Sequence, residues 1–486
     1  MIPSSISKKY FGIPQSNCNS FDSVFPTFRM KVPDAMRTTV FPILFSLCLG
    51  TSFAQSGLPP MGGGELIIEQ DEQCLSPEQR VEIRAMIDAN KAELRLTTSS
   101  SDSKKMLMAF DWPLQKAAGF DWYSYYGISN FVDQDPTAGL LDYYCDDRTY
   151  DGHFGTDIFT WPFPWYMVEN DLGEVIAAES GVIVGKIDGN DDDHCDCFGT
   201  WNAVYIQHVD GSESWYGHMK KGSLTTKGVG ETVEKGEYLG VVASSGCSTN
   251  AHLHFEVYDG SGDLVDPYAG SCNSLNTESW WADQHEFRES KINTLLTHNA
   301  IPIHGCPGTA EEPYMDDSYL DGETVRTAAY YQDQQTGQTS NYRILQPDGT
   351  VWQSWTHSSP LTYNASWWYW TWDLPSGGPY GFWTFEVTYE GETYEHQFTY
   401  GDLSQIQEQD IDPALAYPNP SENHIIHLTT SESSFEKLEL ANASGQLVFT
   451  AATYQSSFDF SNLADGIYYL TIQSDSKAKT QRLVFQ

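Results

Sequence analysis

The clearest helical pattern lies near the N-terminus, in the segment SPEQRVEIRAMIDANKAELRL that begins at Ser76. Ser76 is a suitable N-cap, with Pro77 at the first helical position and Gln79 three residues after the cap. Apolar residues then recur at helical spacing, at Val81, Ile83, Met86, Ile87 and Leu94. The pattern predicts a short helix, followed by a polar linker, TTSSSDSKK. We assign both to residues 55–105, which form either an inhibitory prosegment or an N-terminal brace.

The rest of the chain is patterned as β-strands. Residues 106–281 contain short β-prone runs separated by Gly and Asp turns, such as GVIVGKI, NAVYIQHV and HLHFEVYD, which predict an antiparallel β domain. After a linker at 282–310, a second block at 311–402 alternates apolar and polar residues in WTFEVTYE, as in one sheet of a β-sandwich. A further linker at 403–413 precedes a third block of short strands at 414–486.

Three tryptophans in the second block, Trp368, Trp370 and Trp372, would line one face of a strand. Such a stripe is either sandwich core or a platform for sugars. Core is the favoured interpretation, because large aromatic side chains dominate protein interiors.

The net charge of the chain limits the classes of binding partner that we expect. The chain has 66 acidic against 26 basic residues and a formal net charge of −40. Nucleic acid is therefore not expected as a partner, since phosphate backbones are bound by clustered Lys and Arg. The negative charge is either a means of staying soluble, which we favour, or an attraction for cationic substrates.

Residues 1–54 are predicted to be a leader. Translation is expected to start at Met36, where Arg37 precedes an apolar stretch from Val40 to Leu49, and a signal peptide would be cleaved after Ala54. That stretch is too short to span a bilayer, and we expect no transmembrane segment. The protein is thus expected to be exported.

Export affects how the cysteines are interpreted, because exported proteins commonly form disulfides. Seven of the nine follow the leader: Cys74, Cys145, Cys195, Cys197, Cys247, Cys272 and Cys306. We expect disulfides, with at least one cysteine left over or paired with another chain. The insertion DGNDDDHCDCFGTW could mimic a zinc site through His194, Cys195 and Cys197, or bind calcium through its acidic run. A solvated loop held by disulfides is the favoured interpretation.

Histidines supply the candidate chemistry. In the strand HLHFEVY, His252, His254 and Glu256 share one face, which is either a rigid metal-binding face or simply a wet one. Upstream, His153 and Asp157 flank Gly155 in HFGTD. They form either a surface pair in a loop or, with one later histidine, the three protein ligands typical of catalytic zinc. Gly155 would let the backbone turn tightly.

His218 follows WYG and is expected at a strand end near the other histidines. The series His-x-Gly-x-Asp, Tyr-x-His and His-x-His resembles the M23 metallopeptidases of the lysostaphin and LytM type over roughly residues 150–270. The resemblance implies one catalytic Zn²⁺ held by His153, Asp157 and His254, with His218 and His252 as catalytic histidines.

The third block resembles the C-terminal sorting domain of the type IX secretion system, through the YPNP motif at Tyr417, the LADGIY hairpin at Leu463 and the terminal strand. Its ending RLVFQ departs from the Lys or Arg found in many such domains. The resemblance implies a small β-sandwich, handling by the type IX machinery, and passage through the periplasm to the outside or the cell surface.

The expected fold is therefore mainly β: an antiparallel β catalytic domain and two small β-sandwich domains, with a short N-terminal helix. The expected function is a secreted zinc metalloendopeptidase that cuts peptides rich in glycine and small residues, with peptidoglycan cross-links as the first choice. The alternatives are a protease of Gly-rich proteins such as elastin, and a non-catalytic module that binds cell wall or matrix.

Overall fold

The computed structural model describes residues 58–66, 73–96, 109–306 and 310–401, together with most of 416–486. The chain divides into two units, Met1–Phe53 and Ala54–Gln486, and every described residue belongs to the second. The predicted signal peptide and the polar linkers at 97–105 and 403–413 lie outside the described residues.

The predicted N-terminal helix is confirmed as α1, Pro77–Leu94. The Ser76 hydroxyl accepts a hydrogen bond from the Gln79 N–H, and the Gln79 side chain accepts one from the Ser76 N–H. This reciprocal capping box fixes where the helix begins. The helix ends at Arg95, which adopts the left-handed conformation common after a last turn.

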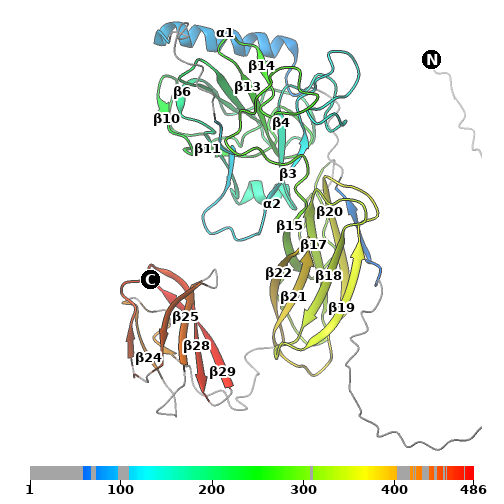
Figure 1. Ribbon diagram of the computed structural model, residues 1–486, viewed down its shortest axis with the longest axis vertical. Helices are drawn as coiled ribbons and strands as arrows, with labels where there is room; N and C mark the ends of the chain where they lie inside the picture. The colour runs from blue at the N-terminus through cyan, green and yellow to red at the C-terminus, as the bar shows by residue number, and fades with distance from the viewer. Residues whose placement is uncertain are drawn as a thin grey trace, which may run out of the picture. The chain divides into compact units, whose positions relative to one another are not determined.

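The first β domain, within residues 109–281, is built on an eight-stranded antiparallel sheet in the order β10-β6-β8-β9-β13-β4-β3, with β14 paired to β13 (Figure 1). Its strands are Tyr126–Asn130 (β3), Thr156–Thr160 (β4), Gly181–Ile187 (β6), Ala203–Gln207 (β8), Glu213–Gly217 (β9), Thr232–Val233 (β10), His252–Tyr258 (β13) and Leu264–Val265 (β14). Around this sheet lie helix α2 (Pro164–Glu169), a three-stranded sheet and a two-stranded sheet. These smaller sheets contain Leu114–Lys116 (β2), Gly173–Ile176 (β5) and Tyr238–Val241 (β11), and Asp196–Cys197 (β7) and Cys247–Ser248 (β12).

The two faces of the large sheet pack against different partners. Alternation along β13 sends Leu253 and Phe255 into a large apolar core on one face. On the other face, Tyr258 belongs to a smaller cluster that contains Ile83 and Ile87, the buried residues of α1. Helix α1 thus covers the face of β13 that carries His252 and His254.

The central sandwich consists of a four-stranded sheet, β1-β20-β17-β15, and a five-stranded sheet, β16-β22-β21-β18-β19. Its strands are Gly62–Glu65 (β1), Lys291–His298 (β15), Ser318–Tyr319 (β16), Thr324–Gln332 (β17), Thr339–Leu345 (β18), Val351–Ser358 (β19), Ala365–Asp373 (β20), Gly381–Tyr389 (β21) and Glu392–Tyr400 (β22). Two of these strands lie outside the expected block at 311–402. Strand β15, in the segment expected to be a linker, pairs with β17, and β1 joins from the N-terminal segment.

Trp368, Trp370 and Trp372 of β20 are buried in the core of the central sandwich. The tryptophan stripe is therefore core, as favoured from the sequence, and is not exposed to serve as a sugar platform.

The C-terminal domain has two sheets, β23-β24-β27 and β26-β25-β28-β29. Its strands are Ala416–Tyr417 (β23), Ile425–Leu428 (β24), Lys437–Asn442 (β25), Leu447–Ala451 (β26), Ser457–Asp459 (β27), Gly466–Ser474 (β28) and Lys477–Phe485 (β29). Ile426, Leu440, Leu470 and Leu483 contribute to its apolar core. The mainly β fold class predicted from the sequence is confirmed.

Three disulfides form among the described residues, Cys145–Cys272, Cys195–Cys306 and Cys197–Cys247. Cys195 and Cys197 therefore each form a disulfide, with Cys306 and Cys247 respectively, and are not zinc ligands with His194. This agrees with the disulfide-held loop that the sequence favours. Neither α1 nor α2 has the length and apolar character that a membrane crossing requires, and these are the helices of the described residues.

Candidate metal centre

Two neighbouring strands bring the first predicted ligands together. In the antiparallel pairing of β13 with β4, His254 lies opposite Asp157. His153 lies in the loop just before β4, and its side chain reaches the same point. Gly155 permits this convergence by its small size, because a Cβ there would lie 2.8 Å from His254 Nε2. The backbone bends at Gly155, as expected, and its φ is not positive, so the close approach rather than a left-handed conformation requires glycine.

The polar atoms of these three residues face one another. His254 Nδ1 lies 2.7 Å from Asp157 Oδ1 and 3.3 Å from His153 Nε2. His153 Nε2 lies 3.2 Å from Asp157 Oδ2. Two atoms bound to one zinc ion at about 2.0–2.1 Å with tetrahedral angles are separated by about 3.3 Å. The donor types and most of these spacings fit a zinc ion.

The outer nitrogen of each candidate ligand histidine is held in place. His153 Nδ1 donates to the Phe131 carbonyl oxygen at 2.6 Å, and His254 Nε2 lies 2.8 Å from Glu256 Oε1. Such partners orient the ring and leave the other nitrogen as the ligand atom. Glu256 is in turn ion-paired with Arg80 of α1.

His218 and His252 lie beside this cluster, with ring centroids 4.4 Å apart. His218 follows β9, as expected, and adopts a φ of 62°, in the left-handed region that non-glycine residues seldom occupy. Its Nδ1 donates to the Ser245 carbonyl at 2.6 Å, and His252 Nδ1 donates to the Asn250 carbonyl at 2.8 Å. Neither buried Nε2 atom hydrogen-bonds to a nitrogen or oxygen of the described chain.

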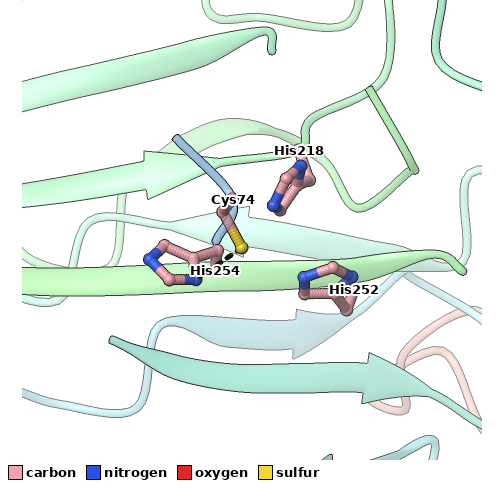
Figure 2. Close-up of side chains that lie close together, drawn as sticks. All are labelled: Cys74, His218, His252 and His254. Carbon is pink, nitrogen blue, oxygen red and sulfur yellow. Dashed lines mark hydrogen bonds between the residues drawn. The ribbon is translucent and has the colours of Figure 1, made fainter. Parts of the chain in front are cut away.

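A cysteine that the sequence analysis did not place here completes the cluster. Cys74, just before α1, points its Sγ between His254 and the pair His218 and His252 (Figure 2). The Sγ lies 3.4 Å from His254 Nδ1 and 3.1 Å from the Tyr150 hydroxyl. Two overlapping sets of potential metal ligands result: Cys74, His153, Asp157 and His254, and Cys74, His218, His252 and His254.

Burial and charge shape the titration of these groups. Burial opposes the charge on Asp157, but His153 and His252 hold the pKa of its carboxyl well below its usual value. Burial likewise opposes ionisation of Cys74, yet His254 and His218 hold the pKa of the thiol well below its usual value. Burial lowers the pKa of His218 and favours its neutral form. Burial opposes the charge on His252, but Asp157 raises the pKa of its imidazole. The site thus combines two anionic groups, Asp157 and Cys74, with histidines whose pKa values are shifted in opposite directions.

The acidic insertion forms no comparable site. Asp191 pairs with Lys221, and Asp188 and Asp192 accept backbone N–H groups of Gly222 and Lys221. Among the described residues, the clusters that could hold a metal ion include no carboxylate of this loop. The structure therefore gives calcium no support.

The fold and site define a class of protein. The model of peptidase family M23 matches residues 166–267. The first β domain is an M23 peptidase domain, and the predicted resemblance is confirmed. The matched segment includes His218, His252 and His254, whereas His153 and Asp157 precede it.

A second family model identifies the end of the chain. The secretion system C-terminal sorting domain matches residues 415–486. This peptidase is therefore a secreted or cell-surface protein, and the sorting-domain resemblance is confirmed.

Several solved M23 structures are similar to the chain. The catalytic domain of the antimicrobial peptidase lysostaphin from Staphylococcus simulans shares 24% identity over 32% of this chain and 96% of its own, with a TM-score of 0.19. A mutant catalytic domain of the prophage-encoded M23 protein EnpA from Enterococcus faecalis shares 25% identity over 29% and 88%, with a TM-score of 0.20. A zinc-containing peptidase from Vibrio cholerae shares 20% identity over 35% and 41%, with a TM-score of 0.22. No curated protein matches the chain.

Proposed function

We propose that this protein is a secreted zinc metalloendopeptidase that hydrolyses peptide bonds in the cross-links of bacterial peptidoglycan, which are rich in glycine and small residues. The observation that carries the proposal is the convergence of His153, Asp157 and His254 beside two further histidines with inward-facing Nε2 atoms. The match to family M23 supports a peptidase and supports peptidoglycan as its substrate.

His153 Nε2, the Asp157 carboxylate and His254 Nδ1 would hold the ion. When bound, zinc supplies Lewis acidity, which polarises a scissile carbonyl and lowers the pKa of water toward neutrality. Because Phe131 O and Glu256 fix the outer nitrogens, the two imidazoles would remain aimed at the ion during turnover.

His218 and His252 would move the protons. A backbone carbonyl can only accept, so each Nδ1 carries a hydrogen and each neutral ring has its lone pair at Nε2. One Nε2 would take the proton of the attacking water and pass it to the leaving amine. The other, when protonated, would stabilise the negative charge that develops on the carbonyl oxygen. The two roles are not assigned to particular residues.

Release of new amino termini tests this function. Peptidoglycan, a glycine pentapeptide and elastin are offered separately to the zinc-loaded chain with Cys74→Ala, Arg84→Ala and Lys91→Ala, because the cysteine side chain fills the space beside the histidines and the two cations fasten α1 over them. Cleavage that is fastest with peptidoglycan and absent when His254→Ala is added is the expected result. Preference for elastin would favour a protease of Gly-rich proteins. A zinc-loaded chain that cleaves none of the three would contradict the proposal.

A further inference from the structure

We propose that the Cys74 thiolate is the fourth ligand of the zinc ion, and that residues 73–96 hold the peptidase latent through this bond. These residues, which include α1, are called the clasp. The inference rests on the proposed zinc site and adds its regulation.

The position of the sulfur fits a metal ligand. Cys74 Sγ, His153, Asp157 and His254 offer ligand atoms that all lie within 4.8 Å of one another. Zinc binds thiolate sulfur at about 2.3 Å and imidazole nitrogen at about 2.0 Å, which separates the two atoms by about 3.5 Å in a tetrahedral shell. The observed separation of Sγ and His254 Nδ1 is 3.4 Å.

Charge balance favours the same four ligands. Two neutral imidazoles, one carboxylate and one thiolate around Zn²⁺ give a shell with no net charge. A neutral shell suits this site, because an uncompensated charge in a buried position is costly. As the sulfur binds, the S–H bond breaks, the thiol proton passes to solvent, and the bond between sulfur and zinc forms.

The Cys74 sulfur also occupies the space in which water or substrate would bind. Cys74 Sγ points between His254 and the rings of His218 and His252, the two histidines proposed to move protons (Figure 2). The potential ligand atoms of these four residues all lie within 4.8 Å of one another. A catalytic zinc site keeps its fourth position open for water or substrate, whereas a closed site has four protein ligands. With Cys74 bound, the site has the closed arrangement.

Charged contacts fasten the clasp to the sheet. The Arg80 guanidinium donates to both oxygens of Glu256, at 2.8 and 2.9 Å. Arg84 and Lys91 pair with Glu213 at 2.7 and 2.5 Å. Both glutamate side chains are at most 4% exposed, so these are shielded, charge-assisted hydrogen bonds, which are among the stronger kind.

The clasp closes the site to substrate. Cys74 and the five candidate site residues are each at most 3% exposed. A polypeptide cannot reach such a site until the clasp moves away. If residues 73–96 were only an N-terminal brace, the packing of α1 on the sheet would be explained. The position of the Cys74 sulfur beside all four histidines would not be.

X-ray absorption at the zinc edge of the intact full chain tests the ligand. We expect one sulfur neighbour at about 2.3 Å, replaced by nitrogen or oxygen after Cys74→Ala. The cobalt-loaded unmodified chain should also show sulfur-to-cobalt charge-transfer absorption, a readout that needs no variant to fold. Bound zinc with only nitrogen and oxygen neighbours in the unmodified chain would overturn this inference and leave the proposed function standing. A chain that binds no zinc would instead overturn both.

Latency is tested with a loosened clasp. Arg84→Ala with Lys91→Ala removes the pairs with Glu213 but touches none of the site residues. In this background, adding Cys74→Ala should raise the rate of peptidoglycan cleavage at least about tenfold, or about 1.4 kcal/mol. Equal rates with and without Cys74→Ala would show that the thiolate does not inhibit. Arg95→Gln, at an exposed residue beyond the helix, is the matched control and should leave the unmodified chain latent.

Discussion

Glu256 Oε1 lies 2.8 Å from His254 Nε2, on the side of the imidazole ring away from Asp157 and His153. The two residues are neighbours on the same face of β13, and this contact decides which nitrogen of His254 faces the other ligands. Burial opposes the charge on Glu256, but Arg80 and His254 hold the pKa of its carboxyl below its usual value. Glu256 is therefore an anionic support for the proposed zinc ligand.

The first prediction removes that support. Glu256→Gln should weaken zinc binding by about 10- to 100-fold, because a neutral amide holds the ring less firmly and lowers the basicity of its ligand nitrogen. Titration against a chelator of known affinity measures the change. Glu213→Gln is the matched control, since Glu213 also pairs with α1, and its hydrogen bonds go to Arg84, Lys91 and Trp215. If both variants weaken zinc equally, the cause is the loss of α1 contacts and not the orientation of His254.

The second prediction separates ligands from proton carriers. His153→Ala should abolish stoichiometric zinc, whereas His218→Ala should keep zinc and lower turnover by about 10²- to 10⁴-fold. Both residues are buried histidines whose Nδ1 donates to a carbonyl, so the two substitutions are chemically matched. Zinc content and kcat are measured on the same samples, with Cys74→Ala, Arg84→Ala and Lys91→Ala present in both so that substrate can reach the site. Loss of zinc from the His218 variant alone would favour the second potential ligand set.

Much of this architecture could be predicted from local sequence. The capping box at Ser76 predicted the start of α1, and the alternation along β13 predicted a strand. The spacing around Gly155 predicted that His153 and Asp157 lie close together. All three are short-range patterns. Strand β15 was missed because its eight residues, KINTLLTH, do not alternate strictly, and its pairing with β17 is a long-range contact. Strand β1 was missed because GGGE has little strand propensity, and it is stabilised by β20.

The candidate site was predicted in part. Its histidines and Asp157 lie in short motifs, so their proximity could be predicted before their geometry was known, and their roles remain proposals. Cys74 lies 79 positions before His153 and belongs to no motif, and only the fold brings it to the site. The available clue was the odd number of cysteines in an exported chain, which left one thiol to explain.

The third prediction concerns the close approach at Gly155. A Cβ there would lie 2.7 Å from the Phe255 carbonyl oxygen and 2.8 Å from His254 Nε2. Gly155→Ala should therefore displace His254, weaken zinc binding and lower the free energy of unfolding by roughly 1–3 kcal/mol. Gly228→Ala is the control, because its Cβ would meet only Glu231 at 3.6 Å. Calorimetry and zinc titration should detect a change in the first variant only, and unchanged zinc affinity there would contradict the predicted displacement.

The fourth prediction concerns Glu311, a partly buried carboxyl that accepts the Tyr166 N–H at 2.7 Å at the start of α2. Burial raises its pKa to about 7, with a small contribution from Glu169, against the opposing effect of the N–H groups of Tyr166, Gly305 and Trp165. Glu311 Oε2 is buried without a hydrogen-bond partner among the described residues.

The raised pKa predicts how stability depends on pH. The folded state binds the Glu311 proton more tightly than the unfolded state, whose pKa is about 4.3, so its contribution is complete below about pH 4. That contribution is lost as the pH rises through about 7, by up to about 3 kcal/mol. Glu311→Gln cannot ionise and should escape this loss. Urea unfolding at about pH 4 and pH 8 should show the variant gaining on the unmodified chain by roughly 1–3 kcal/mol at the higher pH. A stability difference that does not change between the two pH values would mean that Glu311 titrates normally in the folded protein.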